Sequence, residues 1–185
     1  MESNPAIKAN RLSMNRLGLW FFFLSEGFLF SALLVTRFYL LGVTRPPEIN
    51  QLLGFGISAL LLGSSLTAYR AEMFIASGME ARFRRNIFYS ICLGSLFLVG
   101  VGIEWSEAFR YFPPGTVFGS VFVTLTGFHA LHVLLGLAGL LFLIMPGQRG
   151  RFTPDNYLGA EGIIKFWHFV DVVWMFIFAA LYLVN

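Results

Sequence analysis

The sequence predicts an all-α membrane protein, a bundle of five transmembrane helices, and two observations support this prediction. Of the 185 residues, 57% are hydrophobic and only 12% are charged, whereas a soluble domain usually carries about 25% charged residues. The charged residues also gather in short clusters between long uncharged stretches. The uncharged stretches therefore indicate membrane spans, and the clusters indicate the loops between them.

Five apolar stretches with few charged residues reach the roughly 20 residues that a helix needs to cross about 30 Å of hydrocarbon. They cover residues 17–41, 52–74, 86–108, 117–145 and 163–184, and proline or glycine occurs in every connection between them. We expect residues 1–16 to form an N-terminal tail and residues 17–185 a single transmembrane domain. The first stretch is too long for the core of a cleavable signal peptide, so it should stay in the chain as a helix.

The distribution of lysine and arginine predicts the orientation of the bundle. Five spans place the N-terminal tail, the second loop and the fourth loop on one side of the membrane. The basic residues on that side are Lys8, Arg11, Arg16, Arg70, Arg82, Arg84, Arg85, Arg149, Arg151 and Lys165, and those on the other side are Arg37, Arg45 and Arg110. The N-terminus is therefore expected in the cytoplasm and the C-terminus outside. Because the basic residues flank the spans, the net charge of +3 does not indicate a nucleic-acid partner.

Five ionisable residues within the spans form the candidate site. They are Glu26, His129, His132, His168 and Asp171. A charge at the centre of a membrane helix costs about 2.5 to 3.5 kcal/mol on insertion scales, so each such residue needs a partner or a function. We expect them to form an intramembrane cluster that either stabilises the bundle or handles protons.

Glu26 is expected to bond to a histidine of the fourth span. It lies about ten residues, or roughly 15 Å, from the inner end of its helix. His129 and His132 are three residues apart, so they share one face of their helix, and their depth is similar to that of Glu26. Two interpretations stay open: a neutral acid held by a structural hydrogen bond, or a carboxyl group that handles protons.

His168 and Asp171 lie within one turn of the last span, between Trp167 and Trp174. We expect them to pair with each other. That pair would either orient the helix as a structural bridge or conduct protons. The tryptophans are expected to pack against other helices or to anchor the helix near the interface.

Two further patterns concern the small residues of the second span and the acidic residues at the end of the third. The second span carries small residues that let helices approach closely and hydrogen-bond to one another, and packing is the favoured interpretation: Gly56, Gly63, Ser64, Ser65 and Thr67. At the end of the third span, Glu104 and Glu107 lie one turn apart beside Trp105. These two acids could contact a partner, but a solvated rim is the more common arrangement and is the interpretation we favour.

The ligands available to a metal are few. The chain has three histidines, and its single cysteine, Cys92, lies inside an apolar stretch. A haem held by two histidines needs them on facing helices, and copper or zinc needs three or four ligands. We therefore expect no metal and no cofactor in this chain. Phosphate-binding loops and paired nucleophiles are also missing from the sequence, so no catalytic residue is assigned.

Two sequence stretches resemble the last helices of cytochrome c oxidase subunit III. The first is Gly-Phe-His-Ala-Leu-His-Val at 127–133, and the second is Trp-His-Phe-Val-Asp-Val-Val-Trp at 167–174. Further elements follow the order of that family: Ser25-Glu26, Ser64-Ser65-Leu66-Thr67, Glu104-Trp105-Ser106-Glu107-Ala108 and Glu161. The resemblance covers nearly everything after Leu17, and the chain is similar to the last five of the seven helices in the long form. Where many members have further histidines, this chain has Tyr69-Arg70-Ala71-Glu72.

The resemblance implies a non-catalytic third subunit of a haem-copper terminal oxidase in aerobic electron transport, in a bacterial inner membrane. Such a subunit lies beside catalytic subunit I and other oxidase subunits, which hold the haem and copper. It supports proton uptake and the stability of the oxygen-reducing subunit. Bound phospholipid and a larger respiratory supercomplex are further partners that the resemblance suggests.

Other functions remain open from the sequence. The same architecture would suit the third subunit of a quinol oxidase or the homologous subunit of a nitric-oxide reductase. A small proton-coupled transporter could use Glu26 and Asp171, but transporters commonly show repeated halves and broken spans, and the sequence shows neither. A haem-bearing membrane anchor is the last alternative, and an absorption spectrum would identify it.

Overall fold

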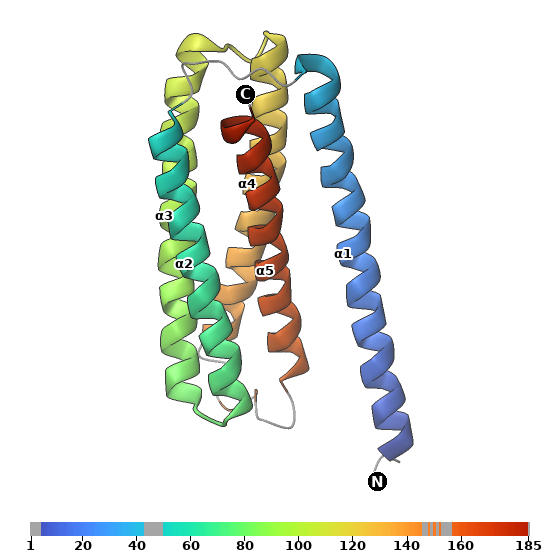
Figure 1. Ribbon diagram of the computed structural model, residues 1–185. Helices are drawn as coiled ribbons and strands as arrows, with labels where there is room; N and C mark the ends of the chain where they lie inside the picture. Colours follow the sequence, from blue (N-terminus) through green and yellow to red (C-terminus); the bar gives the residue numbers. More distant parts are fainter. Residues whose placement is uncertain are drawn as a thin grey trace.

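The computed structural model describes residues 5–42, 50–145, 148, 150, 152 and 157–184, and it is a bundle of five long helices (Figure 1). The helices are α1 (Pro5–Leu41), α2 (Gln51–Ala76), α3 (Glu80–Tyr111), α4 (Val117–Ile144) and α5 (Leu158–Phe178), and a π-helical turn, η2 (Ala179–Leu183), continues α5. All five are long and apolar enough to cross a membrane. The predicted fold class is confirmed. Helix α1 begins inside the predicted N-terminal tail.

Local sequence signals mark where these helices begin and end. The side chain of Asn50 accepts a hydrogen bond from the amide of Leu53 and caps α2, and Thr116 caps α4 in the same way. Such caps satisfy amide groups that have no partner within the helix. Between α2 and α3, Gly78 adopts φ +72°, a conformation that residues with a side chain rarely adopt.

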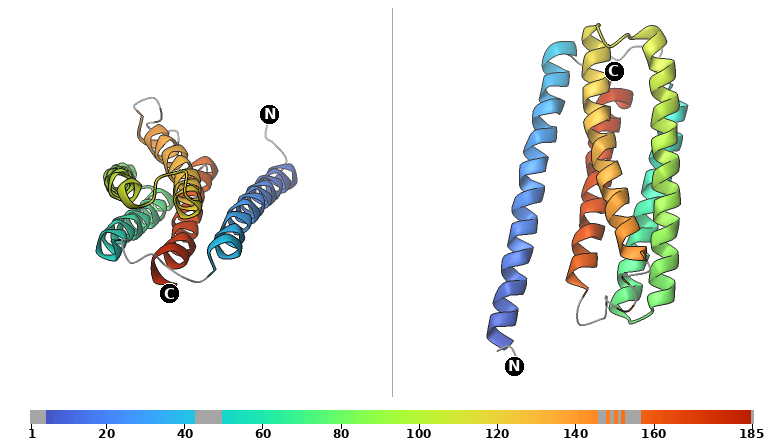
Figure 2. Two further views of the ribbon diagram at one scale, coloured as in Figure 1. Left: turned by 90° about the horizontal axis from the view of Figure 1, so that it is seen from above. Right: turned by 180° about the vertical axis from the view of Figure 1, so that it is seen from behind.

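The helices run alternately up and down, and the two chain ends lie at opposite ends of the bundle (Figure 1). Helices α2 to α5 pack together closely, whereas α1 stands to one side and packs against α4 and α5 (Figure 2). We name the end that holds the N-terminus the inner end and the opposite end the outer end. These names follow the orientation that the basic residues predict, which stays a prediction.

Helix α5 fits among its neighbours because glycines make room for Trp167. A Cβ atom at Gly94 of α3 would lie 2.6 Å from Cη2 of Trp167, and one at Gly136 of α4 would lie 2.7 Å from Cε3. Carbon atoms in van der Waals contact lie about 3.5–4.0 Å apart. The indole of Trp167 therefore occupies space that only glycine leaves open on both helices.

Two tryptophans of α5 donate hydrogen bonds to serine side chains of α2. The indole nitrogen of Trp167 donates to Ser64 Oγ at 3.0 Å, and that of Trp174 donates to Ser58 Oγ at 2.8 Å. Both serine hydroxyls donate in turn to carbonyls of their own helix, so their hydrogen atoms are also used. Both tryptophans are buried. Packing was the correct expectation for them, and anchoring at the interface was wrong.

We predict that Gly94→Ala destabilises the protein more than Gly102→Ala does. Both glycines lie on α3, but a Cβ at Gly102 meets nothing within 4 Å. Alanine raises helix propensity at both positions by a similar amount. At Gly94 it also overpacks the core against Trp167, which costs about 1–3 kcal/mol. Unfolding of the two purified variants in the same detergent measures the difference, and equal stability would show that the tryptophan is not tightly enclosed.

Candidate functional site

The five candidate residues lie in one layer near the middle of the bundle. The four residues of α4 and α5 are about ten to fifteen residues, or roughly 15–22 Å, from the inner ends of their helices. Glu26 is 21 residues, or roughly 32 Å, from Pro5, because α1 extends further at that end (Figure 1). The structure divides them into two groups. Glu26 and His132 join α1 to α4, and His168 and Asp171 lie on α5 where it faces α2. His129 lies between the two groups.

The first group is a hydrogen-bonded pair between α1 and α4. Nε2 of His132 lies 3.1 Å from Oε2 of Glu26, and Nδ1 of His132 lies 2.7 Å from the carbonyl oxygen of Phe128. The side chains of Glu26 and His132 are 21% and 11% exposed. The predicted hydrogen bond between Glu26 and a histidine of the fourth span is therefore confirmed, and the partner is His132.

This geometry fixes how many protons the pair holds. A carbonyl oxygen can only accept, so Nδ1 of His132 carries a hydrogen and donates it to Phe128. Nε2 of a neutral histidine is then an acceptor, and its contact with Glu26 needs one more proton. Either a neutral Glu26 donates its O–H, or a charged His132 donates N–H to a carboxylate. In both states one proton is held between α1 and α4.

His129 makes a different contact from the one that its spacing suggested. Its Nε2 donates to the backbone carbonyl of Val170 at 3.1 Å and so joins α4 to α5. The ring lies against Trp174, with 4.9 Å between the ring centroids, and against Phe97 at 5.7 Å. This residue is 1% exposed, and its Nδ1 has no hydrogen-bond partner in the part of the chain that the structure describes. His129 thus connects two helices and does not contact Glu26.

The second group consists of His168, Asp171 and a serine from α2. Nδ1 of His168 lies 2.6 Å from the hydroxyl oxygen of Ser65, and Asp171 contacts the same hydroxyl. The prediction that His168 and Asp171 pair directly is wrong, since the ion pairs between described residues do not include them. Helix α2 places Ser65 between the two side chains. The sequence indicated Ser65 as one of several small residues that pack closely and hydrogen-bond between helices, and it did not indicate the partners of Ser65.

The second group also has unused hydrogen-bonding atoms. Nε2 of His168 and Oδ1 of Asp171 are buried and have no hydrogen-bond partner among the described residues. No hydrogen bond between the described residues connects this group with Glu26 and His132. The predicted cluster is therefore two separate groups at one depth.

The acids at the two ends of the bundle have different surroundings. At the inner end, Glu161 lies 3.5 Å from a guanidinium nitrogen of Arg16 and also pairs with Lys165. At the outer end, Glu107 is exposed but Glu104 is only 4% exposed. The interpretation of both outer acids as a solvated rim is wrong for Glu104, which is buried and lies against the side chain of Tyr182 in η2.

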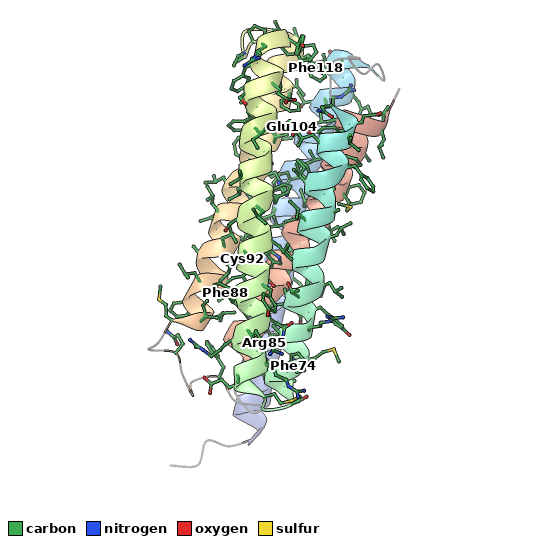
Figure 3. All side chains as sticks on the ribbon, turned by 90° about the vertical axis from the view of Figure 1, so that its left-hand side faces the viewer. Phe74, Arg85, Phe88, Cys92, Glu104 and Phe118 are labelled. Atoms are coloured by element: carbon green, nitrogen blue, oxygen red, sulfur yellow. The ribbon has the colours of Figure 1, made fainter. Side chains whose placement is uncertain are left out.

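The described residues offer no set of ligands for a redox metal. Within residues 5–42, 50–145 and 157–184, no three histidine, cysteine or acidic side chains lie together as a metal site would need. Cys92 lies midway along α3 with its side chain exposed (Figure 3).

Comparison with known proteins identifies the family. The family model for cytochrome c oxidase subunit III matches residues 8–185. The probable cytochrome c oxidase subunit 3 of Nocardia farcinica is 34% identical over 146 residues, which are 76% of this chain and 70% of that protein. The cytochrome c oxidase subunit 3 of Anopheles gambiae is 33% identical over 179 residues, covering 90% of this chain and 68% of that protein. That of Marchantia polymorpha is 34% identical over 182 residues, covering 90% and 67%. The chain therefore belongs to the cytochrome c oxidase subunit III family, whose members are non-catalytic subunits of haem-copper oxidases.

Proposed function

We propose that this chain is the third subunit of a haem-copper terminal oxidase in a bacterial inner membrane, where it lies beside the catalytic subunit. The family match supports the oxidase, and the relatives' names support cytochrome c as the electron donor of the complex. The haem and copper belong to partner subunits in this proposal. This chain contributes a membrane scaffold and a group that holds a proton.

The hydrogen bond between Glu26 and His132 supports a role in proton uptake and stability. It holds one proton near the middle of the membrane, and the Glu26 side chain remains 21% exposed at the surface of this chain. A neighbouring subunit or a water molecule can therefore reach the carboxyl group and exchange that proton. Hydrogen bonding inside a bundle also joins helices, so the same pair fixes α1 to α4.

Helix α1 depends on few other contacts for its position. Its aromatic side chains pack on α5, where Phe23 stacks on Phe169 with 5.2 Å between the ring centroids. Phe30 contacts the ring of His132 edge-on at 5.0 Å. The ion pair of Arg16 with Glu161 adds a contact at the inner end. Loss of the Glu26 hydrogen bond should therefore loosen α1 first.

An apolar groove supports the expectation of bound phospholipid. Trp20 and Phe23 of α1 face His168, Phe169 and Val172 of α5 across it, and Lys165 lies at its inner side. An acyl chain suits the apolar walls, and a lysine near the interface suits a phosphate group.

Co-purification tests the proposed complex. An affinity-tagged chain extracted in mild detergent should bring with it a haem-copper catalytic subunit, detected by mass spectrometry and by the haem spectrum. After the subunits are dissociated, the fraction that contains only this chain should show no haem spectrum. Recovery with the subunits of a nitric-oxide reductase, or with no redox protein, would contradict the proposal.

We predict that Glu26→Ala weakens the attachment of α1 while the complex keeps its haem and copper. The substitution leaves Nε2 of His132 without a partner, which costs about 1–3 kcal/mol for a buried group. Glu26→Gln should cost less, because its amide can donate to Nε2. The measurements are unfolding of the complex and oxygen consumption over repeated turnovers, with retention of the subunit checked by gel.

Ser25→Ala is the matched control, since the Ser25 hydroxyl is exposed and bonds to the carbonyl of Phe22 in its own helix. It should behave as wild type. If Glu26→Gln is mild, the structural role is favoured. If it shortens the active lifetime as much as Glu26→Ala, the carboxyl group handles protons. Wild-type stability, rate and lifetime in both Glu26 variants would mean that Glu26 has no role.

A further inference from the structure

The group of Ser65, His168 and Asp171 buries a carboxyl group that has no ion pair. Asp171 is 6% exposed, and the ion pairs between described residues do not include it. A carboxylate buried without a compensating charge is costly, above all inside a membrane helix. Of the two residues that share the Ser65 hydroxyl with it or accept it, only His168 can also take up a proton. The group therefore avoids a net charge by holding one proton, on either Asp171 or His168.

The hydroxyl group of Ser65 connects the two ionisable side chains. Its oxygen lies 2.6 Å from Nδ1 of His168, and Asp171 contacts the same hydroxyl. A hydroxyl group donates one hydrogen and accepts others, so two hydrogen-bonded arrangements are available. In the first, Nδ1–H of His168 donates to Ser65, and Ser65 donates to the carboxylate of Asp171. In the second, a neutral Asp171 donates to Ser65, and Ser65 donates to Nδ1 of His168.

His168 gives the group a second nitrogen through which a proton can enter. Its Nε2 is buried and has no hydrogen-bond partner among the residues that the structure describes. His168 also lines the apolar groove between α1 and α5, whose volume is about 290 Å³. The groove gives the imidazole ring room to turn. A small rotation of the ring would bring Nε2 to the groove.

Charged residues lead along α5 from this group to the inner end of the bundle. Lys165 lines the same groove one turn nearer that end, and its side chain is 35% exposed, so water comes within one turn of His168. Glu161 lies one turn further along and pairs with Lys165, and Glu72 of α2 interacts electrostatically with Lys165. Toward the outer end, residues 172–181 contain no ionisable side chain. The charged path therefore leads to the inner side of the membrane.

We propose that Ser65, His168 and Asp171 form a proton-binding site that exchanges its proton with the inner side of the membrane. A proton from the inner side binds to Nε2 of His168. The proton on Nδ1 then passes to the oxygen of Ser65, and the hydroxyl proton of Ser65 passes to Asp171. One proton is taken up, and the carboxylate becomes a neutral acid. Burial favours this neutral state over two charges, so the proton rests on Asp171.

The site lies apart from the pair of Glu26 and His132. Its test therefore stands whether or not the role proposed for that pair is correct.

Infrared spectra of the intact complex, recorded during exchange from H₂O to D₂O, test the site. A protonated carboxyl group has a C=O band separate from that of a carboxylate, and the band shifts when deuterium replaces the proton. We expect Asp171→Asn to remove one such band from the wild-type spectrum. Ser65→Ala should keep the band but slow its exchange by about tenfold or more, since it removes the group that passes the proton on. Ser65→Thr keeps a hydroxyl group and should exchange like the wild type.

The matched control is Ser77→Ala, because the Ser77 hydroxyl is exposed and bonds to the carbonyl of Met73 at the end of α2. It should exchange like the wild type. His168→Gln provides a measurement that does not depend on how well Asp171→Asn assembles, and it should keep the band and slow its exchange at least as much as Ser65→Ala. The inference is overturned if Asp171→Asn assembles and removes no carboxyl band. It is also overturned if every carboxyl band exchanges in Ser65→Ala or in His168→Gln as fast as in the wild type.

Discussion

The structure depends on one constraint: polar groups inside a membrane must find partners within the bundle, because the hydrocarbon offers none. Helix α5 carries several of these groups, and α2 and α4 provide partners for them. The indole nitrogens of Trp167 and Trp174 reach serines of α2, and His129 of α4 reaches the carbonyl of Val170. The position of α5 is therefore specified by hydrogen bonds as well as by packing. Of the two polar groups in the middle layer, the pair of Glu26 and His132 is held by α4, and the group of His168 and Asp171 lies on α5.

The sequence predicts well how deep a residue lies in the membrane. It predicts poorly which side chains of other helices contact that residue. The five spans follow from length and charge, and the bond between Glu26 and His132 follows from two residues at one depth on different helices. The prediction of a direct pair between His168 and Asp171 is wrong, because spacing along one helix does not show whether a side chain of another helix enters between the two residues. Ser65 does so, and no periodicity in the sequence indicates which face of α2 meets α5.

The burial of Glu104 follows the same logic. Its place at the end of a span predicts contact with water, but η2 folds Tyr182 over it and Gly54 gives the tyrosine ring its space. Such coverage depends on three helices meeting at one point, which a single sequence does not show. The functional residues differ in the same way: family membership follows from motifs that the sequence displays, whereas the contacts of Ser65 and Tyr182 become visible only once the helices are packed.

The central claim is that hydrogen bonds between α5 and α2 hold the bundle together. A double-mutant cycle on Trp174→Phe and Ser58→Ala tests it most directly, because Trp174 also contacts His129 and Phe97 of the middle layer. The free energy of unfolding is measured in one detergent for the wild type, both single variants and the double variant. We expect a coupling energy of about 0.6–1.7 kcal/mol, the range found for hydrogen bonds between membrane helices. Strictly additive effects, with no coupling energy, would contradict the claim.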